Sequence, residues 1–193
     1  MMFVGRIARA ATTRNVILAL LAFVGVSVAW FQFGIAPRLL ALTPWSDLLD
    51  NTFGYTPRQV YQALGAYGGE GRNLYVAFLL IDLLYAVLSA AALSLALAYI
   101  ARRLLLPANP WQRVALLPIA TSLGDLLENG CLLALTLTYP ARFDPLASLT
   151  SLITTVKLAL VYVSFSLVLF GFVALAITVL TRLLQARQVG QQR

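Results

Sequence analysis

The strongest constraint on this chain is a series of four long apolar stretches, each sufficient to cross a lipid bilayer. They cover about residues 15–37, 73–101, 110–139 and 145–184 of the 193-residue chain. A hydrocarbon core about 30 Å thick requires about 20 apolar residues at a helical rise of 1.5 Å per residue. Backbone polar groups in that core must pair within the segment, which favours helices. The sequence therefore predicts an all-α integral membrane four-helix bundle, with residues 1–193 forming a single transmembrane domain.

Composition supports a membrane protein and excludes several classes of site. Hydrophobic residues make up 61% of the chain and charged residues only 11%, whereas about a quarter of a soluble domain is charged. The chain has no histidine and a single cysteine, Cys131. These counts exclude a histidine-ligated metal or haem, a Ser-His-Asp triad and an internal disulfide. We therefore predict no cofactor and no metal site.

The distribution of arginine predicts the orientation of the spans. Arginines gather before the first stretch, between the second and third, and after the fourth: Arg6, Arg9, Arg14, Arg102, Arg103, Arg113, Arg182, Arg187 and Arg193. Because positively charged loops stay in the cytoplasm, both termini are predicted to be cytoplasmic. Residues 38–72 then form a long outer loop. The net charge of +7 is explained by this sorting and by contact with anionic membrane lipid, so we predict no nucleic-acid partner.

The outer loop contains two signals for the start of a helix. Thr43-Pro44 and Thr56-Pro57 each pair a capping side chain with proline at the first helical position. They predict one or two short interfacial helices, near residues 44–49 and 57–64. The glycine-rich residues 68–71 predict a flexible turn before the second span.

Four ionisable residues lie inside the predicted spans: Asp82, Asp125, Glu128 and Lys157. Each costs about 2.5–3.5 kcal/mol to insert at mid-membrane, so each requires a partner. Counted from the outer helix ends, all four lie about 13–21 Å deep. Since these depths come from three different helices, we expect a single polar cluster in the outer half of the bilayer.

The charges in this predicted cluster do not balance. Asp125, Glu128 and Asn129 share one helix face at spacings of three and four residues. Three carboxylates against one lysine leave an excess of negative charge, which requires a protonated carboxyl, help from Arg72, or a bound cation. No catalytic residue is assigned. The candidate ligand- or ion-binding residues are Asp82, Asp125, Glu128, Asn129, Lys157 and Arg72.

Several short motifs resemble those of an uncharacterised family of small bacterial four-span membrane proteins. They are F-G-Y-T-P at 53–57, Gly71-Arg72 followed by Tyr75, Asp82, D-L-L-E-N at 125–129, Tyr139-Pro140, and T-x-x-K at 154–157. The resemblance covers the chain from Phe53 to the end of the fourth span. It implies the same four spans and the same polar residues, and it implies no activity.

Three hypotheses of function remain open, and they leave open whether the protein is an enzyme. The first is a site that binds or carries a proton, a cation or a small cationic or amphipathic ligand, and the excess of carboxylate favours it. The second is a non-catalytic assembly or scaffold subunit whose ion-pair network is structural. The third is a membrane enzyme acting on a lipid or isoprenoid, with Asp125 or Glu128 as general acid or base. The expected partners are membrane lipid, a small cationic or lipid-like ligand, and further copies of the chain in a homodimer or larger assembly.

Overall fold

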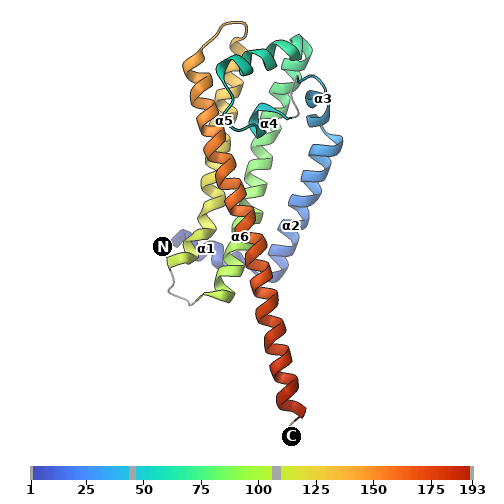
Figure 1. Ribbon diagram of the computed structural model, residues 1–193, viewed down its shortest axis with the longest axis vertical. Helices are drawn as coiled ribbons and strands as arrows, with labels where there is room; N and C mark the ends of the chain where they lie inside the picture. Colours follow the sequence, from blue (N-terminus) through green and yellow to red (C-terminus); the bar gives the residue numbers. More distant parts are fainter. Residues whose placement is uncertain (1, 44–46, 106–109, 192–193) are drawn as a thin grey trace.

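The computed structural model describes residues 2–43, 47–105 and 110–191 (Figure 1), and within these ranges the chain is helical with no strand. The all-α class is therefore confirmed. Short 3-10 turns cover Leu49–Asn51 and Pro110–Leu116, and a π-helical turn covers Ala29–Phe33. The α-helices are α1 (Met2–Ala10), α2 (Thr13–Val28), α3 (Ala36–Leu40), α4 (Pro57–Leu104), α5 (Leu117–Thr138) and α6 (Asp144–Gln191).

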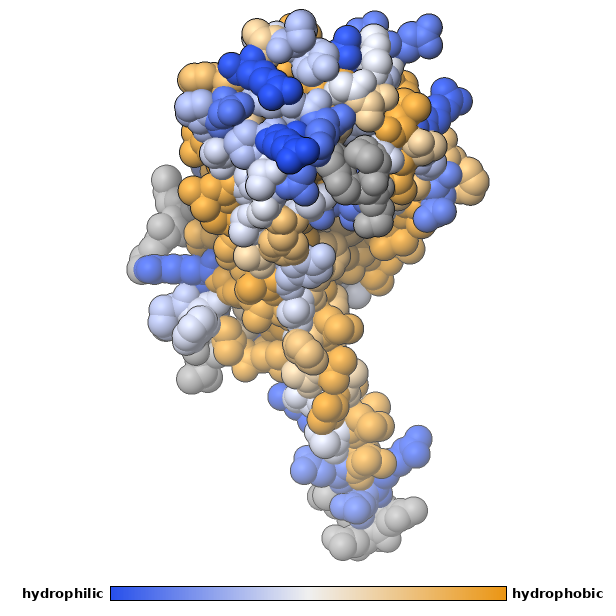
Figure 2. All heavy atoms as spheres, turned by 45° about the horizontal axis from the view of Figure 1, so that its top comes forward, coloured by the Kyte–Doolittle hydropathy of each residue, from blue (hydrophilic) through white to orange (hydrophobic). Residues whose placement is uncertain are grey.

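Three helical segments of the described chain are long and apolar enough to cross a membrane: Thr13–Leu40, Pro57–Leu104 and Asp144–Gln188. Large apolar side chains point outward along them, including Leu21, Leu84 and Phe170, which are 65%, 72% and 68% exposed. Figure 2 shows this apolar surface on the flanks, with polar residues gathered at one end. Residues 38–43 and 47–72 lie at this end and are called the outer segment after their predicted side of the membrane. A surface of this kind suits an integral membrane protein.

The predicted third span stays a prediction. Its helix, α5, has 22 residues and includes the polar D-L-L-E-N stretch, and it is not among the three segments that length and hydropathy select in the described chain. Pro110–Leu116 forms a 3-10 turn ahead of it, so the α-helix begins later than the sequence predicts. Pro118 then lies in the first turn of α5, where its missing N–H costs no hydrogen bond.

The outer segment differs from the predicted loop. The helix expected at 57–64 is present, with the Thr56 hydroxyl accepting from the Gln59 N–H and the Gln59 side chain accepting from the Thr56 N–H. It continues into the second span as α4, whose 48 residues form two helical parts joined by a kink at Gly68. The turn predicted at 68–71 is present as this kink, at which Gly68 leaves the helical conformation (φ 64°, ψ −171°). Of the helix predicted at 44–49, residues 44–46 lie outside the described residues.

The two ends of the chain lie at the opposite end of the molecule from the outer segment (Figure 1). The sequence analysis did not predict α1, which crosses this end of the bundle. The last helix, α6, continues to Gln191, beyond the predicted end of the fourth span at about residue 184. Its C-terminal part extends past the other helices, as expected for a helix longer than a bilayer is thick.

Close packing of α4 against α2 and α6 fixes the walls of the site. Near the outer end, Trp30 stacks on Phe78 with ring centroids 5.1 Å apart, and Tyr75 contacts Phe78 at 6.1 Å. Near the other end, a Cβ added at Gly171 would lie 2.7 Å from Cγ2 of Ile100. Glycine therefore allows α6 to approach α4 closely there.

Candidate functional site

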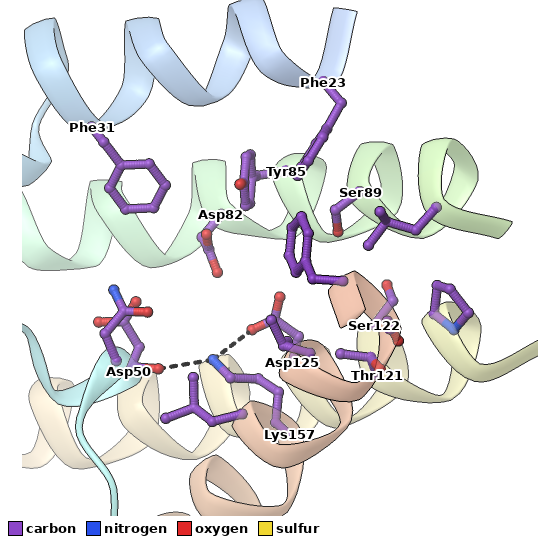
Figure 3. A pocket seen from close by; sticks show the side chains of 17 residues that line it. Phe23, Phe31, Asp50, Asp82, Tyr85, Ser89, Thr121, Ser122, Asp125 and Lys157 are labelled. Carbon is purple, nitrogen blue, oxygen red and sulfur yellow. Dashed lines mark hydrogen bonds and ion pairs between the residues drawn. The ribbon is translucent and has the colours of Figure 1, made fainter. Parts of the chain in front are cut away.

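Lys157 lies at the centre of a buried polar cluster. Its Nζ forms ion pairs with Glu128 and, at 3.1 Å, with Asp125. It also donates to the backbone carbonyl of Asp50 at 3.0 Å, and Figure 3 shows the contacts with Asp125 and Asp50. An ammonium has three N–H donors, so the lysine is fully engaged by these three acceptors. The predicted meeting of α5 and α6 in one charged layer is confirmed.

Glu128 is held from a second side by hydroxyl groups. The Thr154 hydroxyl donates to Glu128 Oε1, and the Tyr55 hydroxyl lies 3.0 Å from the Thr154 oxygen. Burial raises the pKa of the Tyr55 hydroxyl above its ordinary value, so it remains a hydrogen-bond donor at neutral pH. The side chain of Glu128 is completely buried. The Glu128 carboxylate therefore lies between Lys157 and the Thr154 hydroxyl. The Thr154 hydroxyl is in turn hydrogen-bonded to Tyr55 of the outer segment.

Asp82 has a different environment from the other two carboxylates. It is 6% exposed, and its Oδ2 accepts a hydrogen bond of 2.8 Å from Asn129 Nδ2. Within the described chain, the ion pairs are those of Lys157 with Asp125 and Glu128, and none involves Asp82. A buried carboxylate without a cation is energetically costly. The charge imbalance predicted from the sequence therefore includes Asp82.

Asp50 belongs to the cluster and was missed by the sequence analysis. It lies in the outer segment, is 5% exposed, and its Oδ1 accepts no hydrogen bond from the described residues. Burial is the main cause that raises the pKa of its carboxyl to about 7, and the charge of Lys157 opposes the rise. Depth counted along a helix identifies only residues within the spans, so a residue carried inward by a folded loop gives no such signal.

The predicted help of Arg72 in balancing the carboxylates of the cluster is not seen, because its side chain makes other contacts. Its Nη1 donates to the backbone carbonyl of Leu64 at 3.0 Å, and its guanidinium lies 4.5 Å from the centroid of the Tyr139 ring. These contacts join the outer part of α4 to the end of α5. The structure therefore gives Arg72 a packing contact there, away from Lys157.

A cavity of about 140 Å³ lies beside the lysine, between α2, α4, α5 and α6. Asp82 and Asp125 line it from α4 and α5, as Figure 3 shows. The other lining residues include four aromatic rings and several hydroxyl side chains: Phe23, Phe31, Tyr85, Phe165, Ser89, Thr121, Ser122 and Ser164. Asp50 lines the cavity as well, so both carboxylates of the cluster that lack an ion pair in the described chain border a space with mixed apolar and polar walls.

Two other features of the site bear on its chemistry. In the described ranges, no group of three His, Cys, Asp or Glu side chains is arranged to hold a metal ion. Cys131, one turn beyond Glu128 on α5, is a free, partly buried thiol.

The fold and the site together define a helical protein with three helices able to cross a membrane and a buried carboxylate–lysine cluster. Comparison of the chain with protein-family models, with curated proteins and with solved structures gives no match. The resemblance to a family of four-span membrane proteins therefore stays a prediction. Any assignment of function rests on the site itself.

Proposed function

We propose that this chain is a four-span protein of the bacterial inner membrane that binds or carries a cation in the cavity beside Asp82. The cation is a proton, an inorganic cation or a small cationic or amphipathic molecule. The observation that carries the proposal is that Asp82 is buried, lines a cavity, and has no cationic partner among the described residues. In a low-dielectric site, an uncompensated carboxylate strongly favours the arrival of positive charge.

The rest of the cluster supports this assignment, because it keeps Lys157 from serving as the cationic partner of Asp82. The ammonium is occupied by Asp125, Glu128 and the Asp50 carbonyl, so it acts as a fixed internal counter-ion. Four carboxylates, those of Asp50, Asp82, Asp125 and Glu128, surround this one lysine. A bound cation reduces the remaining excess of negative charge.

The scaffold and enzyme hypotheses explain less of the site. A structural ion-pair network accounts for Lys157 and its two partners, but it requires neither the cavity nor a buried Asp82 without a cation. An acid–base enzyme using Asp125 or Glu128 requires a carboxyl group free to exchange protons with a substrate. Both of those carboxylates are paired with Lys157, so we favour the cation site.

The proposed topology is tested by fusing a fluorescent protein to either terminus and measuring which side of the membrane each fusion occupies. If α5 crosses the bilayer with the other three segments, both fusions lie in the cytoplasm. Termini on opposite sides would contradict the four-span arrangement.

The proposed function is tested by thermal unfolding of the detergent-purified protein and of Asp82→Asn. The conditions compared are a lowered pH, sodium, potassium and tetramethylammonium chloride. A ligand that binds only the folded state raises its unfolding temperature, so at least one of these cations should stabilise the wild type more than Asp82→Asn. Glu70→Gln, which removes an exposed outer carboxylate, should respond like the wild type. Identical responses of all three proteins to every cation would contradict the proposal.

A further inference from the structure

The cavity beside Asp82 has a continuous aromatic wall built from three helical segments. Tyr85 on α4 contacts Phe23 of α2, with ring centroids 5.6 Å apart, and Phe31 of the π-helical turn, at 5.9 Å. Phe23 in turn contacts Phe165 of α6 at 6.1 Å. The Tyr85 hydroxyl lies 3.1 Å from the Ser27 hydroxyl, which fixes its ring. A proton or a small inorganic cation gains little from such a wall, because these ions prefer oxygen ligands. An ammonium ion attached to carbon gains both apolar contact and cation–π attraction.

The polar groups of the cavity offer acceptors to a ligand. Ser89, Thr121 and Ser164 each donate their hydroxyl hydrogen to a backbone carbonyl three or four residues earlier on their own helix. Each hydroxyl carries only one hydrogen, so toward the cavity these groups present lone pairs. Asp82 receives its hydrogen bond on Oδ2, which leaves Oδ1 available. The site therefore matches a ligand rich in N–H donors.

The size of the cavity limits the apolar part of such a ligand. Its volume is about 140 Å³, and an apolar protein cavity of about 150 Å³ holds one benzene molecule. The space therefore suits a single ring or a branched group of similar size, and a long acyl chain does not fit inside it.

We propose that the cation bound beside Asp82 is a compact primary or secondary organic ammonium ion. Its N–H groups donate to Asp82 and the cavity hydroxyls, and its apolar body lies against Phe23, Phe31 and Tyr85. This inference rests on the proposed cation-binding function and narrows the class of ligand.

Calorimetric titration of the full-length protein in detergent tests this inference with benzylamine, benzyl alcohol and benzyltrimethylammonium. These probes share one ring and differ in charge and in N–H donors. Because hydrogen bonds to charged groups are the stronger ones, benzylamine should bind at least about tenfold more tightly than the neutral alcohol. It should also bind more tightly than the trimethyl analogue, which lacks N–H donors.

Three variants test which residues cause the preference for benzylamine. Asp82→Asn should remove the preference for benzylamine over benzyl alcohol, and the exposed-site control Glu70→Gln should keep it. Phe31→Leu should weaken benzylamine binding by roughly three- to tenfold through loss of a cation–π contact. Phe31 is partly exposed, so this substitution is compatible with folding, and the comparison of probes on the wild type requires no variant at all.

Equal affinity for benzylamine and benzyl alcohol, absence of benzylamine binding, or a preference that persists in Asp82→Asn would overturn the ammonium proposal. The proposed function is judged separately by the thermal-unfolding comparison with protons, alkali cations and tetramethylammonium. Stabilisation there that depends on Asp82, without a benzylamine preference, overturns the ligand class alone. If Asp82 affects neither experiment, both proposals fail.

Discussion

Asn129 donates a hydrogen bond of 2.8 Å to Asp82 and is the one hydrogen-bond partner that the described part of the chain gives this buried carboxylate. An amide satisfies one oxygen but neutralises no charge. Lys157, by contrast, holds two carboxylates at once. Asp82 is therefore the group in the cluster where stability and ligand binding oppose each other, as is common at functional sites.

Replacing Asp82 by asparagine should stabilise the unliganded protein. The new side chain keeps an oxygen that accepts from Asn129, and the change removes the desolvation cost of an uncompensated charge. We expect the free energy of unfolding to rise by about 1–3 kcal/mol, measured by thermal unfolding in detergent. The exposed-site control Glu70→Gln should change it by less than about 0.5 kcal/mol. A lower unfolding temperature for Asp82→Asn would show that the carboxylate contributes to stability.

Lys157→Met should strongly destabilise the protein, because it leaves the buried Glu128 and the partly buried Asp125 without a cation. Breaking a buried ion pair in this way costs about 3–5 kcal/mol. Adding Glu128→Gln to Lys157→Met removes one of the two unpaired carboxylate charges and should recover part of the lost free energy of unfolding. A double-mutant cycle on the unfolding free energies measures this coupling. If the double variant is no more stable than Lys157→Met alone, the ion pairs described here do not govern the energetics.

The sequence predicts that the polar residues of α4, α5 and α6 meet, because helical geometry determines their positions. Asp82, Asp125 and Lys157 lie at similar depths on three helices, and a rise of 1.5 Å per residue is enough to place them in one layer. The i,i+3 spacing of Asp125 and Glu128 likewise puts both on the face that meets α6. Both inferences depend only on local periodicity, which the folded protein preserves.

The parts that the sequence did not predict depend on tertiary contacts. Asp50 enters the cluster because its carbonyl binds Lys157, and Tyr55 because its hydroxyl meets Thr154. Both lie in a loop without helical periodicity, so no local pattern marks them. By contrast, the turn expected at residues 68–71 is present as a kink at Gly68, because glycine is a local signal that the sequence shows directly.

Gly68 provides a test of the kink in α4. Its φ of 64° and ψ of −171° belong to a region that is essentially restricted to glycine. Gly68→Ala should therefore lower the free energy of unfolding by about 1–3 kcal/mol. Gly69→Ala is the matched control, because an added Cβ meets nothing within 4 Å at either position and Gly69 is helical. Equal unfolding temperatures for the two variants would contradict the kinked geometry.

Asp50 predicts a specific dependence of stability on pH. Burial raises the pKa of its carboxyl from 3.8 to about 7, against the opposing effect of Lys157. Between these values the folded state retains a proton that the unfolded chain has lost, so this group's contribution to stability falls as pH rises and is constant above about pH 7.

Asp50→Asn should remove that contribution. Its stability relative to wild type should therefore increase across this pH range, by at most about 1.4 kcal/mol per pH unit. Chemical denaturation at several pH values measures the difference, with the exposed-site variant Asp47→Asn as control. Parallel pH profiles for Asp50→Asn and wild type would refute the assignment.

Native mass spectrometry of the protein purified from its own membrane, beside Asp82→Asn and Glu70→Gln, tests cation binding at Asp82 most directly. We predict that the wild type and Glu70→Gln carry a cationic species that Asp82→Asn lacks while remaining folded. A bound species retained equally by all three proteins, or a wild type that carries none, would contradict the binding of any cation larger than a proton at Asp82.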